Sequence, residues 1–175
     1  MIAREILFRG KRLGDGKWVE GVAFPHDNNG KVTILRQHPM DGSLMGNEVD
    51  PETVGQYTGL KDKNGRKIFE GDIINFHQFL FDGSEYEKEI LVSIEYMDDT
   101  MCFGLNLLEA EEIKRYMGYD TNSSDKVVVP FNDFYGTHEE SCEVIGNIFD
   151  DKNKGHSSCI QRNKTQLHNG YFAQR

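Results

Sequence analysis

Two pairs of histidine and cysteine residues near the end of the chain have the residue types and the spacing of metal ligands. His138 lies four residues before Cys142, and His156 lies three residues before Cys159. Imidazole nitrogen and thiolate sulfur bind structural zinc at such short spacings. The second pair, however, lies in a segment with few apolar residues. We therefore assign no metal ligand and no cofactor, and zinc binding by these four residues stays an open alternative that elemental analysis can test.

A second group of candidate ligands lies in the middle of the chain. The run Asp62-x-Asn64-Gly65 resembles the start of a calcium-binding loop. Such a loop needs a bidentate acid eleven residues after its first aspartate, and that position is Ile73 in this sequence. The sequence therefore predicts a turn at Asn64-Gly65 rather than a calcium site.

Two carboxylates close to this turn have the spacing of an acid and base pair. Glu70 and Asp72 flank Gly71, and paired carboxyl groups can share a proton-transfer reaction. No histidine or nucleophile lies nearby in the sequence, so the better interpretation is that both carboxylates accept backbone N–H hydrogen bonds within a turn. We predict no catalytic residue and expect that the protein is not an enzyme.

The elements that would position these residues must be short and rich in turns. The chain has 175 residues, of which 37% are hydrophobic and 28% charged, and it contains 18 glycines against four prolines. This composition indicates one modest core with long loops. We expect a single domain at residues 1–150, with an insertion at about 83–135 and a basic polar tail at 151–175.

The cysteine count and the N-terminus indicate a cytoplasmic protein. Cys102, Cys142 and Cys159 are an odd number of cysteines, which is typical of free thiols in a reducing compartment. Arg4 and Glu5 interrupt what would otherwise be an export signal. No apolar run approaches the roughly twenty residues that cross a bilayer, so we expect no membrane contact.

Charge is distributed unevenly along the chain. Residues 1–36 carry seven Lys or Arg against four acids, and residues 152–175 carry five against none. Because the whole chain has a net charge of −9, the middle holds −17. Phosphate binding needs a continuous positive field, so nucleic acid is not an expected partner of the acidic body.

The most informative stretch runs from Val54 to Phe76 and reads VGQYTGLKDKNGRKIFEGDIINF. Asn64 and Gly65 tolerate positive φ, so they predict a tight reversal between two extended segments. Gly71 can adopt a conformation that is unfavourable for other residues, and the apolar run after it predicts another strand. Together these features predict a small curled sheet.

Upstream of this stretch, the sequence predicts an N-terminal hairpin. Residues 4–12 alternate, with Ile6 on one face and Arg9 on the other, which is typical of an edge or outer strand. A Gly-Asp-Gly turn at residues 14–16 leads into a returning strand at 17–24. The next segments are predicted to be a strand at 31–36, a long connection at 37–51 and a turn or single helical turn at 50–53. We expect Trp18, in the returning strand, to be a packing residue.

Downstream, the sequence predicts strands around one helix. Residues 89–97 alternate over four positions and predict a strand, which returns at 101–105. Apolar residues in 105–117 recur at helical spacing before Gly118, so we expect a helix there. The closing strand at 143–149 is expected to bulge at Gly146.

Three segments resemble, in the same order, the YopX family of small proteins carried by bacteriophages and prophages. They are REILFRG at 4–10, VDPETVGQYTGLKDKNGRKIFEGDIINF at 49–76 and EVIGNIFD at 143–150. The resemblance implies a β-rich α+β fold, self-association and no established biochemical activity, and it supplies no catalytic residue. The residues of these motifs to which we assign a structural role are Gln56, Tyr57, Thr58, Gly59, Leu60, Asp62, Gly65, Glu70, Gly71, Asp72, Gly146 and Asn147.

These observations combine into one prediction of fold. We expect a predominantly β, α+β fold, consisting of a small SH3-like, partly open barrel with an N-terminal hairpin and one helical insertion. A fold alone does not define a function, however.

The expected function is that of a non-catalytic phage or prophage accessory protein. We expect it to bind a host or phage protein, or to assemble with copies of itself into a homo-oligomer. The alternative is an enzyme or inhibitor that acts on nucleotide or nucleic-acid metabolism, including mimicry of nucleic acid by the acidic middle.

Overall fold

The computed structural model describes residues 5–26, 30–79, 87–107, 128–130 and 142–150. Within these residues it contains eleven strands and one short 3-10 helix, η1. The bounds are β1 Phe8–Lys11, β2 Trp18–Pro25, β3 Val32–Gln37, β4 Leu44–Val49, η1 Pro51–Thr53, β5 Gly55–Lys61, β6 Lys67–Phe69, β7 Asp72–Phe79, β8 Glu87–Met97, β9 Cys102–Leu107, β10 Val128–Pro130 and β11 Cys142–Asn147. In this part of the chain, no helix has the length and apolar character needed to cross a membrane.

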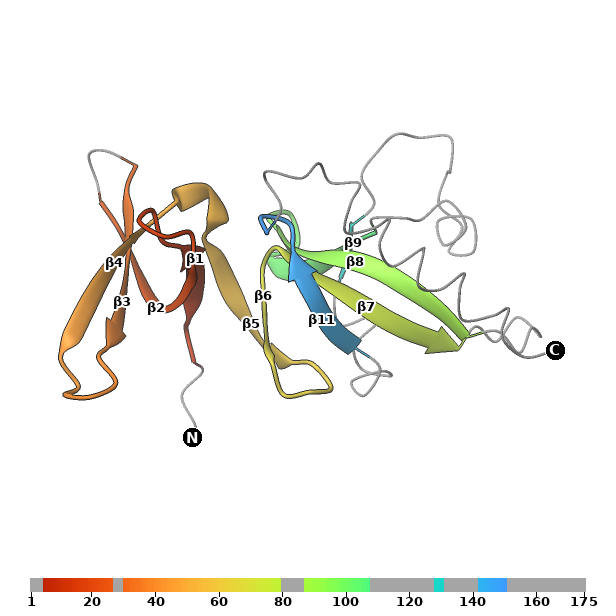
Figure 1. Cartoon of the computed structure of the whole chain (residues 1–175). Helices are drawn as coiled ribbons and strands as arrows, with labels where there is room; N and C mark the ends of the chain where they lie inside the picture. The colour runs from red at the N-terminus through yellow and green to blue at the C-terminus, as the bar shows by residue number, and fades with distance from the viewer. Residues whose placement is uncertain (1–4, 27–29, 80–86, 108–127, 131–141, 151–175) are drawn as a thin grey trace.

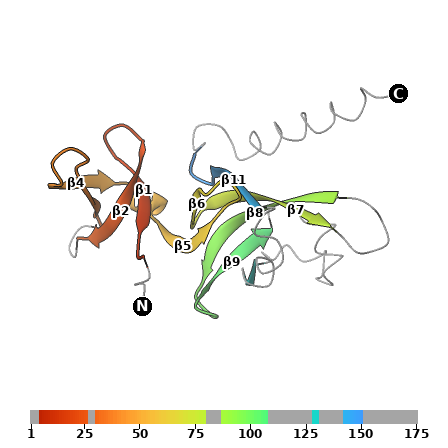
Figure 2. The same cartoon turned by 90° about the horizontal axis from the view of Figure 1, so that it is seen from below.

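The strands form two antiparallel sheets that lie side by side along the molecule (Figures 1 and 2). The first sheet has the order β4-β3-β2-β1-β5-β6, and the second has the order β10-β9-β8-β7-β11. The protein is therefore predominantly β. The predicted N-terminal hairpin is confirmed, because β1 pairs with β2 and Gly16 has a φ of 66° in the turn between them.

The first sheet buries a small apolar cluster on one face. Val19, Ile34 and Val49 come from three different strands and are at most 4% exposed. Alternate residues of a strand point to opposite faces, so the period-two pattern of these sequences places one set inward and leaves the other set outward. The outward set includes Val22 and Phe24, which are half exposed.

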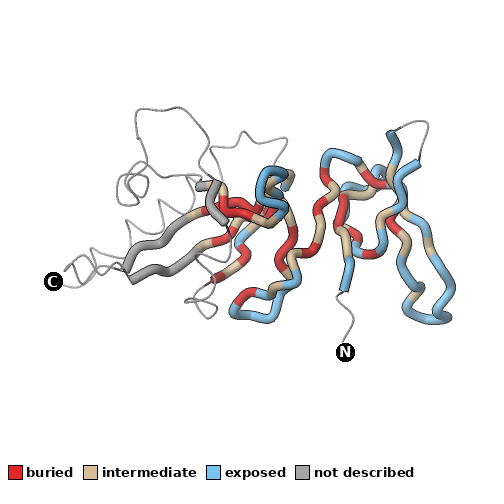
Figure 3. The backbone as a smooth tube through the Cα atoms, turned by 180° about the vertical axis from the view of Figure 1, so that it is seen from behind, coloured by how far each residue is buried: buried red, intermediate tan, exposed pale blue. Residues whose placement is uncertain are grey.

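The second sheet also buries one face. Val144, Ile74 and Val92 lie opposite one another across β11, β7 and β8, and Ile94 lies opposite Leu105 across β8 and β9. All five are at most 6% exposed. Such cross-strand rows of aliphatic side chains stabilise antiparallel pairs, which explains why the alternating 89–97 segment forms the long strand β8. Figure 3 shows that buried segments concentrate at the centre of the molecule.

The chain passes from the first sheet to the second at Gly71. This glycine has a φ of 81°, a left-handed conformation that side chains disfavour. Its N–H donates to the carbonyl of Ile94 at 2.8 Å, and its carbonyl accepts from the N–H of Ile148 at 2.9 Å. The predicted sharp step at this glycine is confirmed, and it redirects the chain from β6 into β7.

The strands form two antiparallel sheets that do not close into a barrel, and the SH3-like part of the prediction is not confirmed. Closure would require a ladder between the two edge strands of one sheet. In the first sheet, the edge strand β4 instead meets the segment that follows β1, through the bridge between Arg12 and Val49 and the hydrogen bond from the N–H of Leu13 to the carbonyl of Glu48. The sequence predicted the step at Gly71, but not that this step sends the later strands into a second sheet.

Three predicted elements differ from the structure. Residues 4–12 do not form an edge strand: β1 lies between β2 and β5, Ile6 is 63% exposed and Arg9 is 5% exposed. The predicted connection at 37–51 contains β4, whose Gly and Asn residues obscured the strand signal. The predicted helix at 105–117 begins in β9, which runs to Leu107, because Leu105 pairs with Ile94 and is buried in the second sheet.

Other parts of the predicted organisation lie outside the described residues. These are the rest of the proposed helix, most of the insertion at 83–135, and the tail at 151–175. The bulge at Gly146 is confirmed by a register shift between Val144 and Gly146 in the pairing of β11 with β7. The single helical turn is confirmed as η1, where the Asp50 side chain accepts from the N–H of Glu52.

Candidate functional site

The three motifs that are far apart in the sequence meet at one buried cluster. Arg9 from β1, Asp72 at the start of β7 and Asn147 at the end of β11 are 5%, 0% and 5% exposed. Asp72 Oδ1 accepts hydrogen bonds from Arg9 Nη2 and, at 3.1 Å, from Asn147 Nδ2. Asp72 Oδ2 accepts from the N–H of Phe69 at 2.9 Å. We call these three residues the junction cluster.

The contacts of the junction cluster hold the two sheets and the closing segment together. The Arg9 guanidinium lies 4.5 Å from the centroid of the Trp18 ring and 4.6 Å from that of Phe69. Trp18 in turn donates to Asp150 at 2.7 Å. A buried charge without a partner is strongly destabilising, and here the charge is paired, hydrogen-bonded and covered by aromatic rings. The predicted role of Asp72, which accepts a backbone N–H at the turn, is confirmed.

Asp62 makes a second connection between the sheets. Its Oδ1 accepts from the N–H groups of Asn64 and Arg66, both at 2.9 Å, and its Oδ2 accepts from the N–H of Val144 at 3.1 Å. Gly65 has a φ of 78° in the same turn. This geometry confirms the predicted turn, and it ties the β5–β6 hairpin to the closing strand β11.

The other predicted motif residues in β5 contact their own strand and β6. Tyr57 packs on Phe69 with ring centroids 5.5 Å apart, and Thr58 Oγ1 donates to the carbonyl of Ile68. Gly59 has a φ of 92° where the pairing of β5 with β6 is irregular. Leu60 and Gln56 lie in the same strand, half-buried. These residues shape the strand.

Glu70 borders a pocket, together with the neighbouring motif residue Gly71. Its Oε2 accepts from the N–H of Gln56 at 3.5 Å, as predicted for a turn carboxylate. Burial raises the pKa of Glu70 above its usual value of 4.5, and the negative charges of Glu95 and Asp98 raise it further. The backbone N–H groups of Gln56 and Tyr96 act in the opposite direction.

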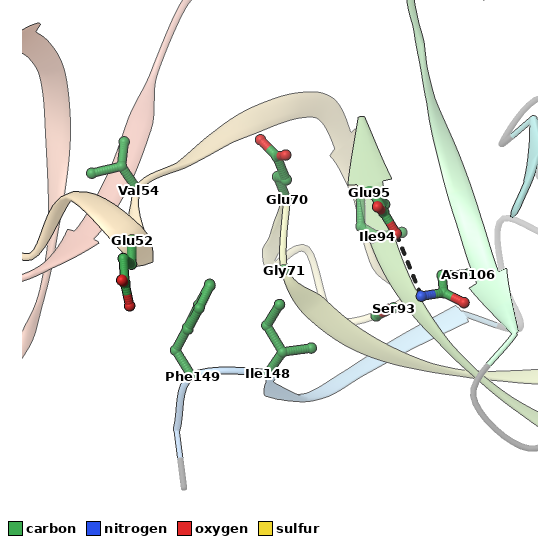
Figure 4. A pocket seen from close by; sticks show the side chains of 10 residues that line it. All are labelled: Glu52, Val54, Glu70, Gly71, Ser93, Ile94, Glu95, Asn106, Ile148 and Phe149. Atoms are coloured by element: carbon green, nitrogen blue, oxygen red, sulfur yellow. Dashed lines mark hydrogen bonds between the residues drawn. The ribbon is translucent and has the colours of Figure 1, made fainter. Parts of the chain in front are cut away.

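The pocket lies at the junction of the two sheets and has a volume of about 310 Å³ (Figure 4). Its carboxylates come from three elements: Glu52 from η1, Glu70 after β6 and Glu95 from β8. Asn106 on β9 also lines it and donates to Glu95 at 3.4 Å. We call it the acidic pocket. None of the described residues that line it is basic.

Of the four candidate zinc ligands, only Cys142 lies within the residues that the structure describes. Cys142 is fully buried, and burial raises the pKa of its thiol to about 12, so it is protonated at neutral pH. Zinc binds the thiolate form. His138, His156 and Cys159 lie outside the described residues, so zinc binding stays untested. In the regions that the structure describes, no three His, Cys, Asp or Glu residues are grouped as a metal site.

A patch of apolar side chains lies on the outer face of the first sheet. Val22, Phe24 and Leu44 are 50%, 56% and 74% exposed. Val22 lies opposite Leu35 on β3, which lies opposite Gly46 on β4, so these side chains share one face. We call Val22, Phe24, Leu35 and Leu44 the outer patch. It adjoins the edge strand β4 and is remote in the fold from the motif residues.

Sequence reasoning missed the role of Arg9 and the whole outer patch. The alternation of residues 4–12 placed Arg9 on the face opposite Ile6, but it did not show that Arg9 is buried and paired with Asp72. Its only sequence signal was its place in the REILFRG segment. The outer patch gave no signal, since exposed Val, Phe and Leu look like core residues until the strand register is known.

Comparisons with known proteins identify a similar solved structure and a family. A crystal structure of protein EF1440 from Enterococcus faecalis is similar, with 22% sequence identity and a TM-score of 0.43 over 83% of this chain and 94% of that chain. No curated protein matches significantly. Residues 7–154 match the family model described as YopX protein, and the chain therefore belongs to the YopX family.

Proposed function

We propose that the chain is a non-catalytic accessory protein of a bacteriophage or prophage that binds protein through the outer patch in the bacterial cytoplasm. The observation that supports this proposal is the exposure of Val22, Phe24 and Leu44 on one sheet face. Contiguous exposed apolar side chains mark interaction surfaces more often than isolated ones do. Free thiols at Cys102 and Cys142 fit a reducing compartment.

The occupant that we propose for the outer patch is a second copy of the chain. The patch adjoins β4, which ends the first sheet. Apart from its end, where Glu48 and Val49 contact Leu13 and Arg12, β4 has no partner on its outer side among the described strands. Two copies of such a strand can pair around a twofold axis, which extends the sheet and places the two patches next to each other.

The alternative function, action on nucleotides or nucleic acid, has weaker support. The acidic pocket is the natural place for a small ligand, but its three glutamates repel phosphate. Asp72, the other candidate acid, is enclosed by the junction cluster. Within this alternative, the charge distribution favours an inhibitor whose acidic surface imitates nucleic acid.

The proposal is tested by photocrosslinking from the outer patch. Phe24 is replaced by the photoreactive residue benzoylphenylalanine, and Met101, which is 81% exposed at the turn between β8 and β9, is replaced in a matched control. Both full-length proteins are irradiated alone and in a bacterial host lysate. We expect a crosslinked dimer from position 24 and none from position 101, and we expect Leu44→Lys to abolish it.

Light scattering gives the independent measurement. The wild-type protein is expected to exceed the monomer mass of 20.1 kDa, and Leu44→Lys to return it to that value. A crosslink from position 24 to one other protein, absent in Leu44→Lys, would replace the second copy by that protein as the occupant. A monomer with no crosslink specific to position 24 would refute the proposal.

A further inference from the structure

The free part of the edge strand β4 is short and is bounded at both ends. The strand begins at Leu44, directly after the turn that joins it to β3. Near its other end, the carbonyl oxygen of Glu48 accepts a hydrogen bond from the N–H of Leu13 at 3.0 Å, so this part of its outer side is already covered. A further strand can therefore pair with β4 only along residues 44–47.

The backbone groups that this free part leaves unpaired belong to two residues. In an antiparallel sheet, the N–H and the carbonyl of a residue point to the same side, and successive residues alternate between the two sides. Glu48 directs its carbonyl outward, so Gly46 and Leu44 also direct their backbone groups outward, away from β3. Neither has a partner on that side among the described residues. The two residues lie symmetrically about Met45.

The side chains of this strand form a knob and a notch on the same sheet face. Leu44 is 74% exposed, whereas Gly46, two residues later, is exposed and has no side chain. A Cβ built on Gly46 would lie 3.2 Å from Cγ2 of Thr33 and 3.5 Å from Cδ2 of Leu35. These two side chains of β3 therefore border an open space above the Gly46 backbone, which we call the Gly46 notch.

We propose that the Gly46 notch receives Leu44 of a second copy of the chain. With a twofold axis at Met45, each Leu44 lies opposite Gly46 of the other copy, and the two residues exchange N–H to carbonyl hydrogen bonds. All the outward backbone groups of these residues are then paired. This inference rests on the proposed function, to which it adds the strand register and the residue that receives the knob.

The second copy is the occupant that fits, because the knob and the notch lie on one strand in the order that a twofold axis requires. In a twofold interface, a residue of one copy contacts a second residue of its partner, and the reverse contact is also made. Leu44 and Gly46 are such a pair, since the axis at Met45 exchanges their positions. The same strand therefore supplies both halves of the contact.

The proposed register also continues an apolar row of the outer patch across the interface. Val22 on β2 lies opposite Leu35 on β3, which lies opposite Gly46 on β4. Leu44 of the second copy takes the next place in this row. Cross-strand neighbours of this kind stabilise antiparallel pairs, as the aliphatic rows do in the second sheet.

The neighbouring registers that keep both outer patches on one face are less favourable. A twofold axis at Gly46 would bring the second strand onto Glu48, whose outer side is already hydrogen-bonded. An axis at Leu44 would bring it onto Gly42, which belongs to the turn and has a φ of 70°. The axis at Met45 avoids both positions.

Disulfide trapping in the full-length protein tests the register. Directly opposed residues that exchange no hydrogen bonds have Cα atoms about 4.5 Å apart, which is within the range of roughly 4.4–6.8 Å that a disulfide spans. Met45→Cys is therefore expected to give a covalent dimer on mild oxidation, with position 45 linked to position 45 in peptide mass spectrometry. Leu44→Cys and Gly46→Cys should give none. The wild-type protein controls for the native cysteines, and Met101→Cys controls for random collision at an exposed position.

A variant that fills the notch tests the contact itself. Gly46→Val should weaken dimerisation about tenfold or more, because the Leu44 side chains of both copies lose their burial. Valine is favoured in strands, so the melting temperature of the protein should not fall. The double variant Met45→Cys with Gly46→Val should lose the covalent dimer.

Light scattering on the same samples separates this inference from the proposed function. A wild-type dimer that links through position 44 or 46, or through none of the three positions, would overturn the register and leave the dimer intact. A dimer that tolerates Gly46→Val would overturn the notch. A monomeric wild-type protein would refute this inference together with the second copy as the occupant of the outer patch.

Discussion

At the scale of single residues, the ion pair between Arg9 and Asp72 is the most consequential contact in the molecule. Both side chains are at least nine-tenths buried, and they lie 63 positions apart in the sequence. The net stabilisation by a buried pair is small relative to an apolar replacement, but the loss of one partner leaves the other charge buried and unpaired. The fold therefore requires that Arg9 and Asp72 are either both present or both replaced by apolar residues.

Asp72→Asn tests this requirement. We expect it to lower the free energy of unfolding by about 3–5 kcal/mol, because Arg9 keeps its charge and loses its counter-ion. Urea denaturation gives the measurement. The matched control is Glu143→Gln, which breaks the partly exposed pair with Lys63 and should cost at most about 1 kcal/mol.

The double variant Arg9→Met with Asp72→Leu distinguishes charge from packing. Removing both charges together should restore much of the stability that Asp72→Asn loses, because no buried charge is left unpaired. If the double variant is as unstable as Asp72→Asn, the cluster acts by shape and hydrogen bonding, and the electrostatic explanation is wrong.

At the scale of elements, close contact between strands determines where the chain tolerates a side chain. Gly55 begins β5 beside the end of β6, and a Cβ built on it would lie 2.4 Å from the carbonyl oxygen of Glu70. Real Cβ atoms do not approach backbone this closely, so the two strands would have to separate. The two strands are also joined here by a hydrogen bond from the N–H of Glu70 to the carbonyl oxygen of Gln56, with a nitrogen–oxygen distance of 2.9 Å.

Gly55→Ala is expected to destabilise the protein by about 1–3 kcal/mol, the usual cost of overpacking. Thermal unfolding followed by circular dichroism measures the change. Gly14→Ala is the control, because a Cβ at position 14 would meet no atom within 4 Å. Equal melting temperatures for the two variants would show that β5 and β6 are free to move apart.

At the scale of the whole molecule, the two sheets are expected to unfold together. The junction cluster, the contacts of Asp62 with β11 and the hydrogen bond from Lys11 to the carbonyl of Phe149 all join the N-terminal half to the closing segment. Sheets that share buried polar contacts of this kind lose them in one step. The protein therefore behaves as one cooperative unit despite its two small cores.

Trp18 is a natural probe for this behaviour, because it is the only tryptophan and contacts both Arg9 and Asp150 at the junction. In urea, its fluorescence and the far-ultraviolet circular dichroism of the strands should give coincident transitions. A fluorescence change at clearly lower urea than the loss of strand signal would show that the junction opens first and that the sheets are separate folding units.

The sequence alone determined most of the strands, the turns at Asn64-Gly65 and Gly71, the bulge at Gly146 and the family. These features are local. Alternation, glycine conformation and short motifs depend on a few neighbouring residues, so they can be recognised without knowing the fold. The local signal failed where glycine and asparagine diluted it, as in β4.

Only the tertiary structure decided which strands share a sheet and which polar residues meet. Asp72 and Asn147 are 75 positions apart, and no local rule pairs them. The same is true of the acidic pocket, whose glutamates come from three elements, and of the outer patch, which depends on strand register. The pairing of strands and of side chains that are far apart in the sequence depends on how much apolar surface and charge the whole fold buries. This burial exists only when the whole chain has folded.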